Sequence, residues 1–220
     1  MGDIDIGRVA VGFLAIVISI TFHEFAHAFV ADRLGDPTPR HHGRLTLNPV
    51  VLWRSHPVGS LVAPLLGAMN GFLLGWAATP VNPQLVHRKY TLRKANFLIS
   101  VAGPASNVLL GLISAGLVVA LFPFARDPDS LFEPLFQLAN MLVLSNVILA
   151  VFNVLPIPPL DGYTVLESLA PDSWATPLRY LREWGMLLLL LVMFRGSFIF
   201  GPIISGVFGA LRGLLRLVYG

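Results

Sequence analysis

Two histidines and a glutamate stand close together in an otherwise apolar run of the sequence. The run is SITFHEFAHAFVADRLGD, residues 19–36, and the three residues are His23, Glu24 and His27. On a helix, positions i and i+4 project from one face about 6 Å apart along the axis, so both imidazoles can bind one metal ion. Glu24 would then lie beside the metal, where a carboxylate can take a proton from water. The H-E-x-x-H pattern therefore predicts a hydrolytic zinc site.

A tetrahedral zinc site needs a third protein ligand, and Asp161 is the best candidate. The chain has no cysteine, and its other four histidines stand in or beside basic loops. Asp161 lies in FNVLPIPPLDGY, residues 152–163, where three prolines break the end of an apolar run. A broken helix at membrane depth is tolerated only where protein or a watery cavity surrounds it. From spacing alone, an ordinary turn aspartate is an equally good interpretation.

The composition predicts an integral membrane protein. Of the 220 residues, 55% are hydrophobic and 12% are charged, and the mean hydropathy is +0.73. The net charge of +3 comes from Arg and Lys in loops, which suits orientation in a lipid bilayer. The sequence shows no basic stripe with interleaved aromatic residues, so we expect no nucleic-acid partner. It also shows no repeat and no long polar segment, so we expect a single domain over residues 1–220.

Long apolar runs predict an all-α polytopic protein with five or six crossings, because each helical crossing needs roughly 20 residues. The runs cover residues 9–31, 58–78, 95–122, 135–155 and 184–219, and Arg195 with Gly196 divides the last of them.

The run at residues 58–78 is a poor match to a lipid-facing helix, because it contains Pro64, Asn70 and four glycines. Residues 32–57 and 79–95 on either side of it are both basic, and basic loops favour the cytoplasmic face. We therefore expect a re-entrant or hairpin segment with both flanks in the cytoplasm. The remaining loops then place Arg8 and Arg126 outside, and Arg179, Arg182, Arg212 and Arg216 inside.

Three motifs together resemble the site-2 protease family of intramembrane zinc metalloproteases. They are HEFAH at 23–27, VAGPASN at 101–107 and NVLPIPPLDG at 153–162. Their order, and the gap of roughly 130 residues between the histidines and the aspartate, match the pattern of that family. The resemblance spans most of the chain and implies a short form without PDZ or CBS modules.

The resemblance also implies roles for individual residues. One zinc ion per chain would be bound by His23, His27 and Asp161, with Glu24 as the general base. Asn153 falls on the family's asparagine eight residues before the aspartate, which would orient or polarise the substrate carbonyl. Without the family, an asparagine that caps a frayed helix end is an equally good interpretation.

Two further polar residues are weaker candidates. Asn107 is a candidate for substrate binding, although packing with an interhelical hydrogen bond is our default expectation. His56 stands in SHPVGS, where family members often have an aspartate before Pro-x-Gly, and we expect no catalytic role for it.

The implied reaction is cleavage of peptide bonds within or near transmembrane helices of membrane proteins, in particular single-span ones. The active site would lie near the cytoplasmic side of the cell membrane. A substrate helix must unwind before attack, and an edge strand can hold the extended peptide. GRLTLNP at 43–49 and TPVNP at 79–83 are the candidate extended β segments, and ordinary surface loops are the alternative.

Two other functions fit the same polar residues. A transporter could relay protons or bind a cation with His23, Glu24, His27 and Asp161, although the sequence shows no inverted repeat. A metal-binding scaffold without activity is the third possibility, and the presence of Glu24 argues against it. The sequence carries no signal for an oligomeric state.

Overall fold

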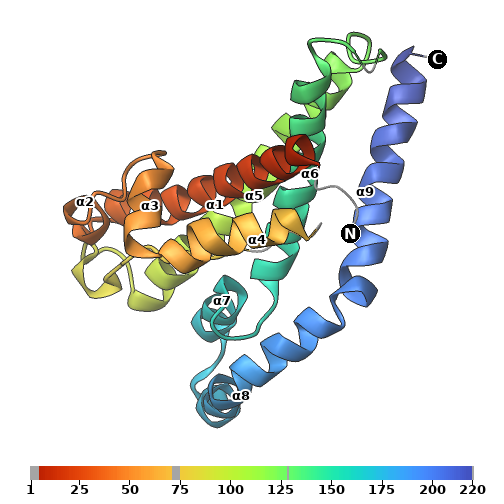
Figure 1. Cartoon of the computed structure of the whole chain (residues 1–220). Coiled ribbons are helices and arrows are strands. Elements are labelled where there is room, and N and C mark those ends of the chain that lie inside the picture. The colour runs from red at the N-terminus through yellow and green to blue at the C-terminus, as the bar shows by residue number, and fades with distance from the viewer. Residues whose placement is uncertain (1–4, 71–74, 128, 220) are drawn as a thin grey trace.

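The computed structural model describes residues 5–70, 75–127 and 129–219, and every regular element in them is helical (Figure 1). The all-α prediction is therefore confirmed for the described residues. In chain order the elements are α1 (Ile6–Leu34), α2 (Thr38–His41), α3 (Pro49–Ser55), the π-helical turn η1 (Val58–Val62), α4 (Ala63–Met69), the 3-10 turn η2 (Pro83–Leu85), α5 (Leu92–Leu121), α6 (Glu133–Val154), α7 (Asp161–Leu169), the 3-10 turn η3 (Asp172–Trp174), α8 (Ala175–Phe194) and α9 (Gly196–Tyr219).

Four helices in the described residues are long and apolar enough to cross a membrane: α1, α5, α6 and residues Phe200–Tyr219 of α9. The sequence predicted five or six crossings. Helix α8 is not among the four, because its first half carries Arg179, Arg182 and Glu183. The apolar helix Val58–Met69 is also too short, since a crossing needs roughly 20 residues. The predicted division at Arg195 is confirmed, because α8 ends at Phe194 and α9 begins at Gly196.

The chain between α1 and α5 leaves one end of α1 and returns to the same end. Asp36 is fully buried just after α1, and its carboxylate accepts hydrogen bonds from the backbone N–H of Thr38 at 2.9 Å and of Asn82 at 2.5 Å. Deeper in the fold, the N–H of Trp76 donates to the carbonyl of Gly59 at 2.9 Å. The segment predicted as re-entrant, residues 58–78, thus has its two ends side by side, at Gly59 and Trp76. Its residues 71–74 lie outside the described part.

The two predicted β segments are loops in the structure, so that part of the prediction is wrong for the described chain. In residues 43–49, the Asn-Pro pair that was expected to end a strand instead begins a helix. The side chain of Asn48 accepts a hydrogen bond from the N–H of Val50 at 3.0 Å, and Pro49 is the first residue of α3. Residues 79–83 likewise lack a neighbouring strand among the described residues, and a lone strand has no ladder of hydrogen bonds to hold it.

Helices α1, α5 and α6 form the centre of the molecule (Figure 1). Apolar clusters hold the end of α1 against the start of α5, and the middle of α1 against α3 and α6. The first cluster contains Ala31, Leu34, Ala95 and Ile99, and the second contains Ile16, Ile20, Leu52 and Leu149. This packing sets the polar face of α1 against α5.

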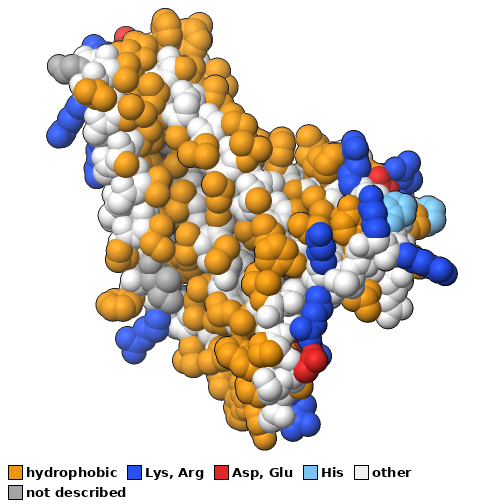
Figure 2. Space-filling model, turned by 180° about the vertical axis from the view of Figure 1, so that it is seen from behind, with side chains coloured by type: hydrophobic (Ala, Val, Ile, Leu, Met, Phe, Trp, Pro, Cys, Tyr) orange, Lys and Arg blue, Asp and Glu red, His pale blue; other side chains and the backbone are white. Residues whose placement is uncertain are grey.

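The outside of the bundle is apolar, as expected for helices that contact lipid. Figure 2 shows hydrophobic side chains spread over the long helices, while most Lys and Arg side chains in this view gather near the right-hand end. The exposed large hydrophobic residues of α5 include Val108, Leu109, Leu112, Ile113 and Leu117. A soluble protein rarely exposes such a continuous apolar surface.

The end of α9 lies beside the end of α5. The hydroxyl of Tyr219 donates to the carbonyl of Val119 at 2.9 Å. Arg212 and Arg216 precede Tyr219 within α9, so they lie toward the same end of the bundle as Arg126. The prediction that placed these two arginines opposite Arg126 is wrong, because it counted α8 as a crossing.

Candidate metal centre

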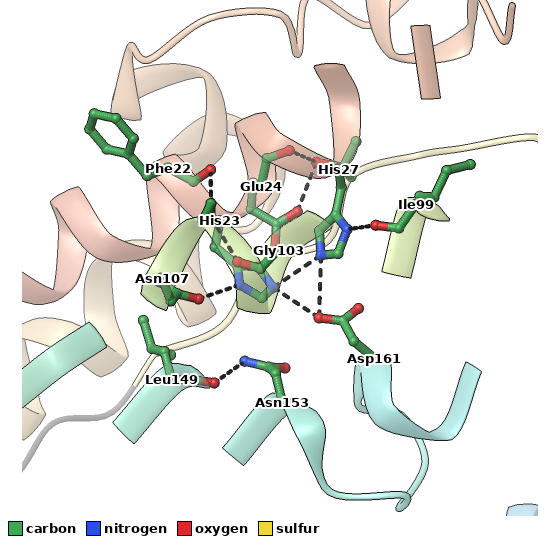
Figure 3. A network of polar contacts seen from close by, with 12 residues as sticks. Phe22, His23, Glu24, His27, Ile99, Gly103, Asn107, Leu149, Asn153 and Asp161 are labelled. Carbon is green, nitrogen blue, oxygen red and sulfur yellow. Dashed lines mark hydrogen bonds and ion pairs between the residues drawn. The ribbon is translucent and has the colours of Figure 1, made fainter. Parts of the chain in front are cut away.

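His23 and His27 lie one turn apart on the buried face of α1, and Asp161 is the first residue of α7. The Nε2 atoms of the two histidines are 3.0 Å apart, and the Oδ2 atom of Asp161 lies 3.1 Å and 3.3 Å from them. Figure 3 shows the three side chains converging on one point. The fold thus brings Asp161 to two possible metal ligands that lie more than 130 residues earlier in the sequence.

The hydrogen bond made by Nδ1 of each histidine determines which ring nitrogen is left to bind a metal ion. Nδ1 of His27 is 2.7 Å from the carbonyl oxygen of Ile99, and Nδ1 of His23 is 2.7 Å from Oδ1 of Asn107. These oxygens can only accept, so both Nδ1 atoms carry protons and donate. In the neutral rings, each Nε2 atom therefore presents a lone pair to the centre of the cluster.

The cluster fits a bound zinc ion. Three lone-pair donors, two nitrogens and one carboxylate oxygen, face one another at 3.0 to 3.3 Å. In the described part of the chain Oδ2 of Asp161 is buried with no hydrogen-bond donor, so the group is electrostatically unfavourable without a cation. A tetrahedron with ligands about 2.0 Å from a zinc ion has edges of about 3.3 Å, close to these separations.

Gly103 of α5 lies directly against the two imidazoles. A Cβ atom at this position would lie 2.3 Å from Nε2 of His27 and 2.7 Å from Nε2 of His23. Any side chain would therefore push the ligands apart. The sequence indicated close helix packing for the motif VAGPASN, but it did not predict that the glycine contacts the ligands themselves.

Asn107 is fully buried behind His23 and belongs to a network that joins three helices. Its Nδ2 donates to Oδ1 of Asn146 at 2.8 Å, and Nδ2 of Asn146 donates to the hydroxyl of Ser19 at 2.9 Å. The expected interhelical hydrogen bond is present, and it orients a metal ligand. The sequence analysis missed Asn146 and Ser19, although polar residues within apolar helices were a signal that could have found them.

Asp161 is positioned by a sharp reversal between α6 and α7. Gly162 packs so closely on the end of α6 that a Cβ atom there would lie 2.2 Å from the carbonyl oxygen of Val154. Only glycine lets α7 begin at this point. The carboxylate of Asp161 then stands in the first turn of α7, where the helix dipole favours negative charge.

Asn153 does not contact the cluster among the described residues. Its amide Nδ2 donates to the carbonyl of Leu149 at 3.0 Å, one turn back on α6 (Figure 3). A role in polarising a substrate carbonyl stays a prediction.

Glu24 is buried and faces a small pocket on the loop side of the site. Its carboxylate accepts a hydrogen bond from the hydroxyl of Thr79 at 2.8 Å. The two loops that were predicted as extended segments both contribute to this pocket, whose lining residues are Thr21, Glu24, Phe25, Arg44, Thr46, Asn48, Val51, Leu52 and Thr79.

His56 lies away from the three ligands. Its Nδ1 atom is 3.2 Å from the hydroxyl of Ser55 and 3.4 Å from Nη2 of Arg44. The group of possible metal ligands in the described residues contains only His23, His27 and Asp161.

Comparison with known proteins identifies relatives over most of the chain. The protein named "Putative zinc metalloprotease YwhC" of Bacillus subtilis is 34% identical over 196 residues, which cover 87% of this chain and 84% of the relative. "Putative zinc metalloprotease Rip2" of Mycolicibacterium smegmatis is 32% identical over 178 residues, or 80% of this chain and 64% of the relative. "Putative zinc metalloprotease Rip3" of Mycobacterium tuberculosis is 28% identical over 92% of this chain, which matches 43% of that relative.

The comparisons with family models and with solved structures gave no match. The similarity to YwhC alone covers more than four fifths of both chains, at 34% identity. It agrees with the three motifs and with the geometry that gathers His23, His27 and Asp161. This chain belongs to the site-2 protease family.

Proposed function

We propose that this protein is an intramembrane zinc endopeptidase that hydrolyses peptide bonds within or near the transmembrane helices of other membrane proteins. The observation that carries the proposal is the convergence of three lone pairs, from His23, His27 and Asp161, at a buried point beside Glu24. The relatives named as zinc metalloproteases support the same chemistry.

In this proposal the residues of the chain divide the reaction between them. His23, His27 and Asp161 would hold a zinc ion, which would supply Lewis acidity to polarise a carbonyl and to lower the pKa of a water molecule toward about 7. Glu24 accepts the proton of the attacking water and passes it to the leaving amine. Asn153 would donate to the developing oxyanion after its amide turns away from Leu149.

The proposed position of the site is near the cytoplasmic side of the membrane. Residues 32–57 and 79–95, on either side of the apolar run 58–78, are both basic, and Asp36 and Asn82 within them meet at the end of α1. The chain between them returns to the end of α1 where it began, which supports a re-entrant segment over a crossing. Glu24 and His27 lie within about two to three turns of that end, so water can reach them from the cytoplasm.

The loops beside Glu24 are the proposed binding surface for an unwound substrate. Residues 43–49 and 79–83 are not strands in this structure, but an added peptide would supply the missing partner. The preferred substrates in this proposal are single-span membrane proteins.

The test is zinc content together with cleavage. Wild-type protein, purified in detergent without chelators, is analysed for zinc beside His23→Ala, Asp161→Ala and Glu24→Gln, and each is assayed on single-span reporter proteins in liposomes. We expect about one zinc ion per chain, lost in the first two variants and kept in Glu24→Gln, which should lose cleavage by about 100-fold or more.

Zinc-free wild type from a metal-replete preparation would refute the proposal. Unchanged cleavage by Glu24→Gln would refute the role of the glutamate. Transport of protons or cations by the zinc-free protein would instead support a relay formed by the same side chains.

A further inference from the structure

Three buried side-chain polar atoms in the described residues have no hydrogen-bond partner: Nη1 of Arg44, Nε1 of Trp53 and Oδ2 of Asp161. The oxygen of Asp161 is explained by the metal centre. The nitrogen of Arg44 is not explained by any part of the site described above. A buried guanidinium N–H without an acceptor is costly, so a missing acceptor is expected there.

Arg44 lines the same small pocket as Glu24, the candidate general base. Arg44 is only 6% exposed, and its other terminal nitrogen, Nη2, donates to the hydroxyl of Ser55 at 2.6 Å. Burial lowers the pKa of the guanidinium, whereas the negative charge of Glu24 acts in the opposite direction. The bond to Ser55 holds the planar group in place and leaves Nη1 as the free donor.

The loop that carries Arg44 also has free main-chain groups. Among the described residues, the backbone N–H and C=O groups of Leu45, Thr46 and Leu47 make no hydrogen bond. An extended peptide can bond to such groups by strand addition. A guanidinium beside them can bond to a carbonyl of the same peptide.

We propose that Arg44 binds a main-chain carbonyl oxygen of the substrate peptide, close to the bond that is cleaved. This assignment rests on the proposed function. A carbonyl fits better than a carboxylate for two reasons. The pocket already contains the carboxylate of Glu24, and a second negative charge would be repelled by it. The pocket is also small, which favours a single carbonyl oxygen over a carboxylate with two oxygens.

The experiment measures binding of zinc-directed probes by calorimetry, so it does not depend on cleavage. Acetohydroxamate carries only the metal-binding group. The hydroxamate of an Ala-Leu-Ala peptide adds main-chain carbonyls, one of which the proposal places beside Arg44. A series of the same peptide replaces each amide in turn with an alkene, which removes its carbonyl. The proteins are wild type, Arg44→Gln, Arg44→Lys and the control Arg54→Gln, whose arginine is exposed on the neighbouring helix α3.

We expect Arg44→Gln to weaken binding of the peptide hydroxamate roughly tenfold and to leave binding of acetohydroxamate unchanged. One alkene probe should bind the wild type roughly tenfold more weakly than the parent peptide does. Arg44→Gln should not weaken the binding of that probe any further. Arg44→Lys should recover part of the affinity, because it keeps the charge but lacks the planar fork. Arg54→Gln should match wild type.

Other results would overturn the assignment. Equal weakening of both hydroxamates would mean that Arg44 only supports the fold through Ser55. A loss with Arg44→Gln that no alkene probe reproduces in the wild type would mean that Arg44 does not bind a main-chain carbonyl. No binding of acetohydroxamate to the wild type would refute the zinc site, and with it both the proposed function and the role of Arg44.

Discussion

Apart from the three ligand atoms that face one another, the two sides of the candidate site differ in how completely their polar groups are bonded. On the metal side, both Nδ1 atoms of the histidines have acceptors, and Asn107 continues the network to Asn146. On the loop side, Nη1 of Arg44 and the main chain of residues 45–47 have no partner among the described residues. Glu24 lies between the two sides and is bonded to Thr79.

This difference indicates a division of labour. The metal side is built from α1, α5, α6 and α7, and its ligands are held in place before a substrate arrives, as preorganised catalysis requires. The loop side keeps free donors and acceptors, which an extended peptide can use. Changes on the metal side should therefore affect zinc, and changes on the loop side should affect substrate while zinc stays bound.

The largest effect is expected from Gly103→Ala. The new methyl group would overlap Nε2 of His27, so the ligands must separate, and zinc affinity should fall by more than about 100-fold. The control is Gly116→Ala on the same helix, where a Cβ atom meets nothing within 4 Å. Zinc titration with a competing chelator measures both. Normal zinc binding by Gly103→Ala would show that the helices of the metal side can move apart to accept the methyl group.

Asn107→Ala should have the next largest effect. Without its oxygen, Nδ1 of His23 loses its acceptor and the ring loses its fixed orientation. Removing such a partner of a metal ligand typically costs 10- to 100-fold in metal affinity, roughly. The matched control is Asn140→Ala, because the amide of Asn140 bonds only to the carbonyl of Phe136 on its own helix, at 2.9 Å. Equal zinc affinities of the two variants would contradict the positioning role of Asn107.

The sequence predicted which residues lie together on the metal side. His23, Glu24 and His27 have a fixed helical spacing. Asp161 follows a proline-broken run, but an ordinary turn aspartate fitted that spacing equally well, so its assignment also needed the resemblance to the family. The contact of Gly103 with the imidazoles was not predictable, because it depends on how closely α5 approaches α1.

The loop side was harder to predict from sequence. The alternation in residues 43–49 indicated a strand, but Asn48 and Pro49 also form a helix start, and without a partner strand the helix start prevails. Arg44 was counted only as a basic flank, because neither its burial nor its free nitrogen has a local sequence signal. The described residues contain four candidate crossings against the five or six predicted, because three charges in the first half of α8 fell outside the apolar run that was counted.

Asp36→Ala tests the loop side and should have a smaller effect than the changes on the metal side. The variant loses the carboxylate that joins the backbone of Thr38 to that of Asn82, so residues 37–41 and 79–82 should open more often. Loss of these bonds costs about 1–3 kcal/mol, so hydrogen exchange in these segments should accelerate roughly tenfold or more while zinc content is unchanged. Asp32→Ala is the control, because its carboxylate pairs with the exposed Arg40. Loss of zinc in Asp36→Ala would mean that the two sides are not independent.

The smallest effect is expected from Thr79→Val, which removes the hydroxyl that donates to Glu24 and keeps the shape of the side chain. The carboxylate then has one orienting bond fewer, and a hydrogen bond of this kind is worth about 1 kcal/mol, so kcat should fall by about three- to tenfold with zinc content unchanged. The control is Thr91→Val, whose hydroxyl accepts from the N–H of Lys94 at 3.2 Å at the start of α5 and does not line this pocket. A higher kcat in Thr79→Val would mean that the hydroxyl restrains the base until a substrate displaces the loop, and Glu24 would then belong to the loop side of the site.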